Sequence, residues 1–483
     1  MTTDIVLAGL LPGWSMRGRR RPLALALLAV GVALPVVFVL SIIATGRNWV
    51  ALTLDTTFLG WIVAVGLLAW SARLVAVVEC WWDAGRPRRL APFEAITAGL
   101  VAVALGLGLF GVVEVGRARA AIAPAFVVSD GVLFDADEPT PTGAGAVTPT
   151  TPPTISSSPA STTTIPVLGA PGVVRDVPAL ATTTTTLPPL PTRPDSGVSA
   201  EALADVTNVL LIGADSGPGR SGLRTDAMML FSLHAPSGRA SLISIPRNLE
   251  RMLLPPGSAL EARYPYGYRG MANAIYIEVT SRRTLRDQYR VDGVRPGVVA
   301  LAQAVGYSLD VTIHDYVLVD MQGFLELIDA LGGVTVRLTR SVPMPGNVPG
   351  APTQYPDRIG PGVVEMDGTT ALGYVRSRKD DNDYRRAGRQ RDLLAALATQ
   401  VSWSDVATSF GDVAAAVGGT LSTSLTPDEL ADTLSVIGGE TAIVESVGLV
   451  PPLVRVTRPD FQEMAEIVGA VRLALVTGQP SGY

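Results

Sequence analysis

The sequence predicts an α/β domain that is preceded by an all-α membrane region of three transmembrane helices. Three apolar segments of about twenty residues lie in the first quarter of the chain. They account for a mean hydropathy of +0.34, which is high for a soluble enzyme. After residue 200, short apolar runs typical of strands alternate with segments of helical periodicity, and this alternation indicates the α/β class.

The apolar segments are predicted to cross a membrane at about residues 23–45, 57–78 and 96–116, after a cytoplasmic N-terminus of residues 1–22. Arginines precede the first span and lie between the second and third spans, whereas the loop between the first two holds only Arg47. Positive flanks stay in the cytoplasm. We therefore expect everything after the third span to be extracytoplasmic.

A secretory signal peptide is the alternative for the first span, with Arg17 to Arg21 as its n-region. The apolar stretch is longer than an ordinary h-region and two further spans follow, which favours an uncleaved anchor. The single cysteine, Cys80, stands at the cytoplasmic end of the second span. The exterior domain is therefore expected to have no disulfide framework.

Residues 117–200 are predicted to be an extracytoplasmic disordered linker. From about Asp135 the composition turns to Pro, Thr, Ser and Gly, which cannot bury enough apolar surface to fold. We expect an extended tether that holds the following domain away from the membrane or reaches through a cell wall. A plain spacer and a carrier of O-linked sugar on its threonines both fit this composition.

Residues 201–476 are predicted to form the α/β domain, followed by a tail of residues 477–483. Pro236-Ser237-Gly238 predicts a hairpin between the second and third strands. Strands are expected at 206–213, 228–234, 239–245, 316–320, 334–338 and 442–450, and helices at 296–307, 323–331, 367–374, 385–401, 427–437 and 461–475.

Two aspartates and an arginine stand at strand ends. Asp215 follows the first strand and Asp226 opens the second, so adjacent strands would bring their side chains together. Paired carboxylates commonly hold Mg²⁺ beside phosphate oxygens. Taken alone, the pattern also fits aspartates that cap or turn the chain, which is the simpler interpretation. Arg247 follows the third strand, where an isolated arginine is usually solvated surface.

A cluster of basic residues lies between Arg376 and Arg391, where seven of sixteen positions are Arg or Lys. Most charge runs are solvated helix faces. Helical spacing nevertheless places Arg386 and Gln390 on one stripe with three leucines, so both side chains should point inward. Arg385 and Arg391 fall on the opposite side and are expected to face solvent.

An inward arginine must meet an anion, because an unpaired charge in a low dielectric is costly. Asp215, Asp226 or Asp383 could supply the anion as part of an internal ion-pair network. A ligand phosphate is the alternative, and bidentate arginine contacts suit a diphosphate. Arg376 and Arg378 are two apart in a segment predicted to be extended, so they would project to one side and could join the same site.

Several classes of site are not expected. Neither of the two histidines has a second histidine at metal spacing, so no zinc site is expected. The sequence contains no Gly-x-Ser-x-Gly elbow and no Walker-type glycine loop. The net charge of −5 gives no general attraction to polyanions, and we expect no nucleic acid partner.

Short motifs follow one another between residue 206 and about residue 401. In chain order they are 208–215 (NVLLIGAD), 224–228 (RTDAM), 244–247 (SIPR), 315–317 (DYV), 323–324 (GF), 329–334 (DALGGV), 374–378 (YVRSR), 383–386 (DYRR) and 389–390 (RQ). In this order they resemble the LytR-CpsA-Psr family of bacterial cell-envelope proteins. Each motif is unspecific by itself, whereas the ordered set is specific.

The resemblance implies an α/β/α domain, with a central mixed sheet flanked by helices and an apolar pocket for the polyprenyl tail of a lipid carrier. It also implies a phosphotransferase of the bacterial cell membrane, with Mg²⁺ as cofactor. This enzyme would move a glycopolymer from polyprenyl pyrophosphate onto peptidoglycan, so its implied partners are the lipid-linked glycan, the peptidoglycan acceptor and the membrane.

The resemblance also implies roles for seven residues, all of which except the glutamine would be catalytic. The family's metal-linked aspartates match Asp215 and Asp226. Its pyrophosphate-contacting positions match, in chain order, Arg247, Arg376, Arg378, Arg386 and Gln390. Asn248 stands where the family usually has aspartate, which leaves the orientation of Arg247 open. The Asn273-Ala274 pair lacks the family's glycine-rich continuation.

Two alternatives remain at this point. The domain could be a non-catalytic binder of polyprenyl phosphates that organises envelope assembly, or a scaffold module whose arginines form internal salt bridges. In the phosphotransferase hypothesis an acceptor hydroxyl attacks the sugar-linked phosphorus and polyprenyl phosphate leaves. The sequence does not identify the general base, for which an aspartate of the site is expected.

Overall fold

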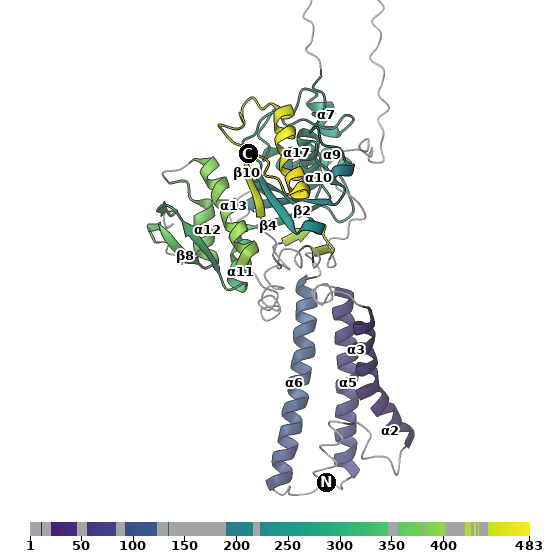
Figure 1. Cartoon of the computed structure of the whole chain (residues 1–483). Helices are drawn as coiled ribbons and strands as arrows, with labels where there is room; N and C mark the ends of the chain where they lie inside the picture. Colours follow the sequence, from purple (N-terminus) through teal and green to yellow (C-terminus); the bar gives the residue numbers. More distant parts are fainter. Residues whose placement is uncertain are drawn as a thin grey trace, which may run out of the picture.

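The computed structural model describes two parts of the chain, a group of long apolar helices and an α/β domain (Figure 1). The described residues are 11, 21–45, 56–83, 92–122, 134, 190–215, 223–345, 356–379, 382–400, 421–426, 429, 430, 433 and 443–483.

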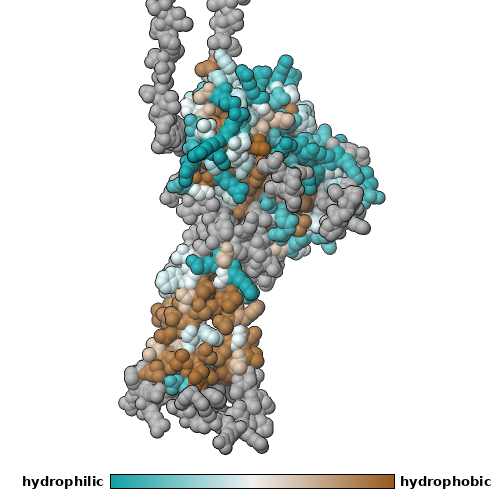
Figure 2. Space-filling model, turned by 180° about the vertical axis from the view of Figure 1, so that it is seen from behind, coloured by the Kyte–Doolittle hydropathy of each residue, from teal (hydrophilic) through white to brown (hydrophobic). Residues whose placement is uncertain are grey.

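The three predicted spans are helices long and apolar enough to cross a membrane. The first is one continuous helical stretch of α2 (Arg21–Leu28), a π-helical segment (Ala29–Ala33) and α3 (Leu34–Thr45). The second and third are α5 (Thr56–Asp83) and α6 (Pro92–Ile122), and both extend beyond the predicted apolar stretches. The surface of these helices is largely apolar, whereas the α/β domain is largely hydrophilic (Figure 2).

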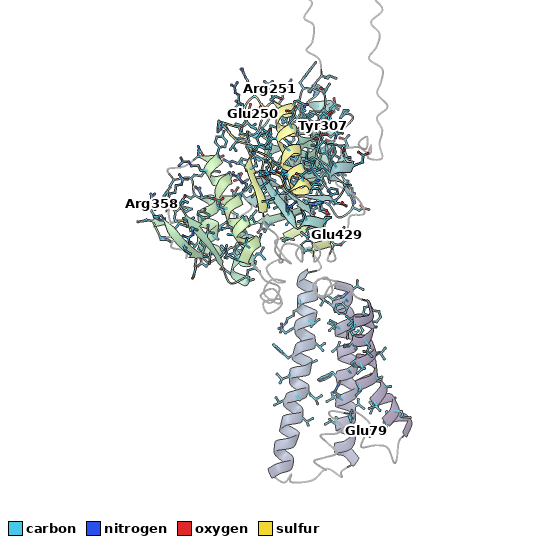
Figure 3. The ribbon with its side chains drawn as sticks, in the orientation of Figure 1. Glu79, Glu250, Arg251, Tyr307, Arg358 and Glu429 are labelled. Atoms are coloured by element: carbon cyan, nitrogen blue, oxygen red, sulfur yellow. The ribbon has the colours of Figure 1, made fainter. Side chains whose placement is uncertain are left out.

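Helices α5 and α6 pack side by side. The Trp70 indole of α5 donates a hydrogen bond to the Leu105 carbonyl of α6 at 2.9 Å. Near the other end of the pair, the Arg119 guanidinium lies against Gly60, where a Cβ would be 3.2 Å from it. Figure 3 shows that Glu79, near the end of α5, lies at the end of the bundle away from the α/β domain.

A six-stranded mixed sheet forms the centre of the α/β domain, in the order β10-β3-β2-β1-β4-β9. Strand β1 runs antiparallel to β2 and parallel to β4, while β10 runs parallel to β3. The strands are β1 (Val206–Asp215), β2 (Arg224–His234), β3 (Arg239–Ser244), β4 (Asp315–Asp320), β9 (Leu421–Thr423) and β10 (Ile443–Gly448). The predicted β2–β3 hairpin is confirmed, and its turn ends at Gly238 with φ of 65°.

One face of the sheet supports the main core. Alternate β1 residues, Leu210, Ile212 and Ala214, point to this face and pack against helices. The covering helices are α8 (Ala274–Ser281), α10 (Pro296–Leu309) and α17 (Phe461–Thr477), with the short helices α7 (Ala259–Arg263) and α9 (Arg283–Gln288) at the side.

The other face of the sheet carries a second lobe. It contains α11 (Met321–Ala330), α12 (Gly368–Arg376), α13 (Asp383–Gln400) and two small sheets. The small sheets pair β5 (Val334–Leu338) with β8 (Gly362–Met366) and β6 (Val342–Pro343) with β7 (Arg358–Ile359). Helices thus flank the mixed sheet on both faces, which confirms the predicted α/β/α class. The lobe stands apart from the main core in Figure 1.

Of three further local predictions in the domain, one strand is confirmed, one segment differs from its predicted conformation, and one helix lies mostly outside the described residues. The predicted strand 334–338 is β5, but it pairs with β8 outside the central sheet. The segment of Arg376 and Arg378 is not extended throughout, because α12 continues to Arg376. The helix predicted at 427–437 falls mostly outside the described residues.

The predicted linker also differs from the structure wherever the structure describes it. Helix α6 continues to Ile122, Phe134 is 6% exposed within the main core, and residues 193–196 contact the α/β domain. The folded domain therefore begins before residue 201. At the other end, the predicted tail is partly held, since the Ser481 amide donates to Glu445 Oε1 at 2.9 Å.

Candidate functional site

A cavity of about 1070 Å³ lies between the central sheet and the second lobe. Strands β1, β2 and β4 form its floor, and residues of α11, α12 and α13 line its other walls. The seven residues singled out in the sequence all line it: Asp215, Asp226, Arg247, Arg376, Arg378, Arg386 and Gln390. The structure therefore brings together residues that are up to 175 positions apart in the chain.

The cavity has an apolar portion and a charged portion. On β1, Leu211, Gly213 and Asp215 alternate along the cavity face, so the floor changes from apolar to acidic within five residues. The apolar walls come from the other strands and from α11 and α13, and include Val317, Phe324, Leu327, Leu393, Leu394 and Leu397. A ligand that fills the whole cavity must be amphipathic.

Asp215 and Asp226 both line the charged end of the cavity, where the register between β1 and β2 shifts. Gly213 pairs with Ala227 and Ala214 pairs with Thr225, so Asp226 is the extra residue of a bulge. A bulge changes the direction of a side chain at a strand end. Both Asp226 and Ala227 consequently line the cavity.

Arg247 is held by two carboxylates. Its Nη1 lies 2.9 Å from Asp226 Oδ1, and its Nε lies 2.8 Å from Asp383 Oδ2. Burial lowers the pKa of Arg247, but the two hydrogen-bonded carboxylates outweigh burial and raise it. These contacts fix the orientation that Asn248 left open, without a carboxylate at position 248.

Asp383, in the first turn of α13, lies among three arginines. Arg247 is the first of these. The other two approach Asp383 Oδ1, with Arg378 Nε at 3.5 Å and Arg386 Nη1 at 3.7 Å. Burial alone would raise the pKa of Asp383. The hydrogen bond from Arg247 and the charges of Arg386 and Arg378 outweigh burial, so the pKa lies below its ordinary value. Asp383 is therefore an anchor for the arginines and a poor proton acceptor.

Arg386 is a desolvated cation at the cavity wall. The residue is 5% exposed, and burial lowers its pKa to about 10 despite the nearby Asp383. Its Nη2 donates to the Asp226 carbonyl at 3.3 Å, while its buried Nε has no hydrogen-bond acceptor among the described residues. The nearby charges of Arg247 and Arg378 lower the pKa of Arg386 further. An anion in the cavity would compensate this charge.

The rest of the basic cluster divides into cavity and structural residues. Arg376, Arg378 and Lys379 are exposed at the cavity mouth. Gln390 lines the cavity, and its Nε2 is 3.5 Å from the Val375 carbonyl. Arg389 is buried and donates to the carbonyls of Tyr374, at 2.9 Å, and Ser377, so it joins α13 to the end of α12.

Arg385 is exposed, as predicted, but the prediction for Arg391 is wrong. The Arg391 guanidinium donates to Ser446 Oγ at 3.1 Å and to Ser244 Oγ, because the ends of β3 and β10 cover that side of α13. Burial lowers the pKa of Arg391.

Sequence reasoning assigned no role to three other charged residues that line the cavity. Arg224 is the β2 partner of Asp215, Lys379 follows Arg378, and Asp320 ends β4 beside Ala214. Asp320 also begins α11, where its Oδ1 accepts a hydrogen bond from the Gly323 amide at 2.9 Å. The sequence signals for these residues are the Arg-Thr-Asp motif for Arg224, the basic run for Lys379, and the end of a predicted strand for Asp320.

The described residues contain no group of three or more His, Cys, Asp or Glu side chains that could hold a metal ion. Two carboxylates at the charged end, Asp215 and Asp226, still fit Mg²⁺, which commonly takes one or two carboxylates together with water and substrate phosphate oxygens. Both histidines have structural roles, because His234 bonds with Ser237 Oγ at 2.7 Å and His314 Nδ1 accepts from the Asn208 amide at 3.0 Å.

Comparison with protein families places residues 185–450 in a model described as the LytR_cpsA_psr family. A teichoic acid transferase of Oceanobacillus iheyensis, named polyisoprenyl-teichoic acid–peptidoglycan teichoic acid transferase TagU, is 29% identical over 240 residues, which are 49% of this chain and 64% of that relative. A Bacillus cereus protein of the same name is 26% identical over 231 residues, which are 47% of this chain and 64% of the relative. The chain thus spans slightly less than two thirds of these relatives.

Two solved structures match more than half of this chain. Bacillus subtilis TagV is 20% identical with a TM-score of 0.41, and the match covers 57% of this chain and 98% of that protein. Bacillus subtilis TagT is 21% identical with a TM-score of 0.37, and the match covers 57% of this chain and 93% of that protein.

Proposed function

Since the chain belongs to the LytR-CpsA-Psr family, we propose that it is a membrane-anchored phosphotransferase that moves a glycopolymer from a polyprenyl-pyrophosphate carrier onto peptidoglycan. The names of the relatives support this proposal, because both refer to the transfer of a polyisoprenyl-linked polymer to peptidoglycan. The α/β domain would then lie outside the cytoplasm, as the arginine distribution around the spans predicts.

The observation that carries the proposal is the excess of positive charge at one end of an amphipathic cavity. Among the described residues, six cations line the cavity, namely Arg224, Arg247, Arg376, Arg378, Lys379 and Arg386, against the three carboxylates of Asp215, Asp226 and Asp320. Asp383, behind this wall, still leaves the cations in excess. A pyrophosphate would compensate the excess charge, while the apolar portion suits a polyprenyl chain.

Each side chain then has a role that follows from its geometry. Arg247, held between Asp226 and Asp383, presents a fixed guanidinium, whereas exposed Arg376 and Arg378 can close on the phosphates from the mouth. Arg386 stabilises negative charge most strongly because it is already desolvated. Asp215 and Asp226 would hold Mg²⁺, which when bound supplies positive charge to the phosphate oxygens.

In the proposed reaction an acceptor sugar hydroxyl attacks the sugar-linked phosphorus, and a new P–O bond forms to the acceptor. The bond from this phosphorus to the bridging oxygen breaks, and polyprenyl phosphate leaves with that oxygen. The proton of the hydroxyl passes to an aspartate of the site. Since the pKa of Asp383 is lowered, Asp215, Asp226 and Asp320 are the candidates.

The proposal is tested by transfer of a lipid-linked glycan to peptidoglycan by the full-length protein. Arg386→Ala should lower turnover by about 100-fold, because a preorganised charge at the reacting phosphate is lost. The matched control is Arg385→Ala, which removes a neighbouring but exposed arginine outside the cavity lining and should leave turnover near wild type. Equal turnover of both variants would contradict the proposed role of the cavity.

A further inference from the structure

The segment predicted to be one long linker touches the α/β domain at two points, and both lie at one corner of the fold. This corner comprises the end of α10 and the residues that lead into β4, from Gly306 to Ile313. The first contact involves Phe134, and the second involves residues 193–196.

Phe134 occupies a fitted position at this corner. It forms an antiparallel bridge with Ile313, with amide-to-carbonyl distances of 3.1 Å from Phe134 and 2.8 Å from Ile313. Its ring is part of the main core and is 6% exposed. Gly306 makes room for the ring, since a Cβ at this position would lie 2.1 Å from Phe134 Cδ1. A larger residue at position 306 would displace the ring.

The second contact is polar and centres on Asp310, which ends α10 in the left-handed conformation with φ of 53°. The Asp310 carboxylate accepts a hydrogen bond from the Ser196 amide at 2.8 Å and forms an ion pair with Arg193. Burial raises the pKa of Asp310, but these partners lower it. Asp195 adds a reciprocal pair with Gln462 of α17, at 3.0 and 2.7 Å.

The corner thus holds both Phe134 and residues 193–196, which lie on either side of the Pro- and Thr-rich stretch in the sequence. Because both attachments are to the same corner, the number of residues between them does not set the reach between membrane and domain. Eleven residues, 123–133, separate the end of α6 from Phe134 in the sequence. Eleven residues reach at most about 40 Å when fully extended.

We propose that the Gly306–Ile313 corner is an intramolecular docking surface for the juxtamembrane segment at Phe134. Residues 135–189 then form a closed loop. The distance between the membrane and the α/β domain is limited to the length that residues 123–133 can span. This inference replaces the expected long tether and does not depend on the proposed function. In Figure 3, Tyr307 of α10 lies in the part of the domain away from the bundle.

Matched insertions test the proposal on the full-length protein in vesicles. One variant carries about twenty Gly/Ser residues after residue 128, and the other carries the same insertion after residue 160, inside the proposed loop. Both carry Cys80→Ser and Tyr483→Cys, so that one dye labels the exposed C-terminus. Energy transfer to an acceptor lipid in the outer leaflet reports the height of the domain.

The proposal predicts that insertion after residue 128 lowers energy transfer, because it adds a reach of about 25 Å, whereas insertion after residue 160 leaves transfer at the level of the uninserted chain. A single long tether predicts small and equal decreases for both variants. Equal changes would overturn the proposal.

A disulfide provides a second test that does not involve the insertions. Phe134 and Ile313 form a hydrogen-bonded antiparallel pair, in which the two Cα atoms are about 5.5 Å apart and within disulfide range. A variant with both Phe134→Cys and Ile313→Cys should therefore form a disulfide across this contact. With a protease site at residue 160 and Cys80 replaced by serine, the cut chain should stay joined without reductant and separate with it. The control pairs Phe134→Cys with Val363→Cys on β8. Joining no greater than in this control would overturn the proposal.

Discussion

The Arg247 guanidinium and the Asp383 carboxylate join the end of β3 to the first turn of α13, with Nε and Oδ2 2.8 Å apart. Asp226 holds the same guanidinium from β2. A cation at the end of one strand is thus fixed by a carboxylate of the neighbouring strand and by a carboxylate of α13, on the wall of an amphipathic cavity. The charged end of the site depends on how α13 docks on the sheet.

Asp383→Asn should destabilise the protein at neutral pH, since it removes the charge that Arg247, Arg378 and Arg386 share. The pKa of Asp383 is lower in the folded state than its ordinary value of 3.8, so its contribution is complete well above pH 3.8. The contribution is lost as the pH falls through the folded-state pKa.

The measurement is the stability difference between wild type and Asp383→Asn from pH 7 down to acid, by chemical unfolding. The difference should be constant above about pH 5 and shrink below about pH 4. Asp392→Asn on the same helix is the matched contrast. Because burial raises the pKa of Asp392, this variant should gain stability at neutral pH and lose that gain toward acid. A stability difference between wild type and Asp383→Asn that grows as the pH falls would contradict the proposed role of Asp383.

Arg386→Met should stabilise the domain while it weakens anion binding. Burial lowers the pKa of Arg386 to about 10, so the charged side chain is held at a cost that an apolar residue of similar length avoids. We expect the melting temperature to rise by about 2 °C. Inorganic pyrophosphate should raise the melting temperature of wild type more than that of the variant. A less stable variant that retains the full pyrophosphate effect would refute this role for Arg386.

Gly388→Ala should stabilise the protein without a change in activity. Gly388 lies within α13, and a Cβ at this position would meet no atom within 4 Å. Alanine in a helix interior is favoured over glycine by about 0.8–1.0 kcal/mol. Chemical unfolding measures the gain, and turnover that matches wild type shows that the cavity is intact. A loss of stability would mean that the outer side of α13 is covered.

Helical periodicity predicted the most specific feature of the site, the inward orientation of Arg386 and Gln390. It succeeded because the stripe with Leu393 continues across the helix face that packs on the cavity. Helical periodicity was wrong for Arg391, because the phase of one helix carries no information about Ser446 of β10, which lies 55 residues later in the chain.

Other features were beyond sequence reasoning because they rest on single long-range contacts. The bulge that directs Asp226 into the cavity follows from the pairing of β2 with β1 and has no residue signature. Phe134 stands alone before a Pro- and Thr-rich stretch, and its position depends on a glycine that lies 172 residues later, Gly306. Composition indicated a linker, but it could not show that both ends of the segment return to one corner.

The central claim is that this charged cavity performs phosphoryl transfer and does not only bind a lipid. The most direct measurement compares transfer of a lipid-linked glycan with binding of the same donor, for wild type and Asp215→Ala of the full-length protein. The account predicts that the variant loses turnover by at least about 100-fold and still binds the donor, because the arginines and the apolar walls remain. Turnover at the wild-type level in Asp215→Ala would contradict the account, and so would tight donor binding by wild type without any transfer.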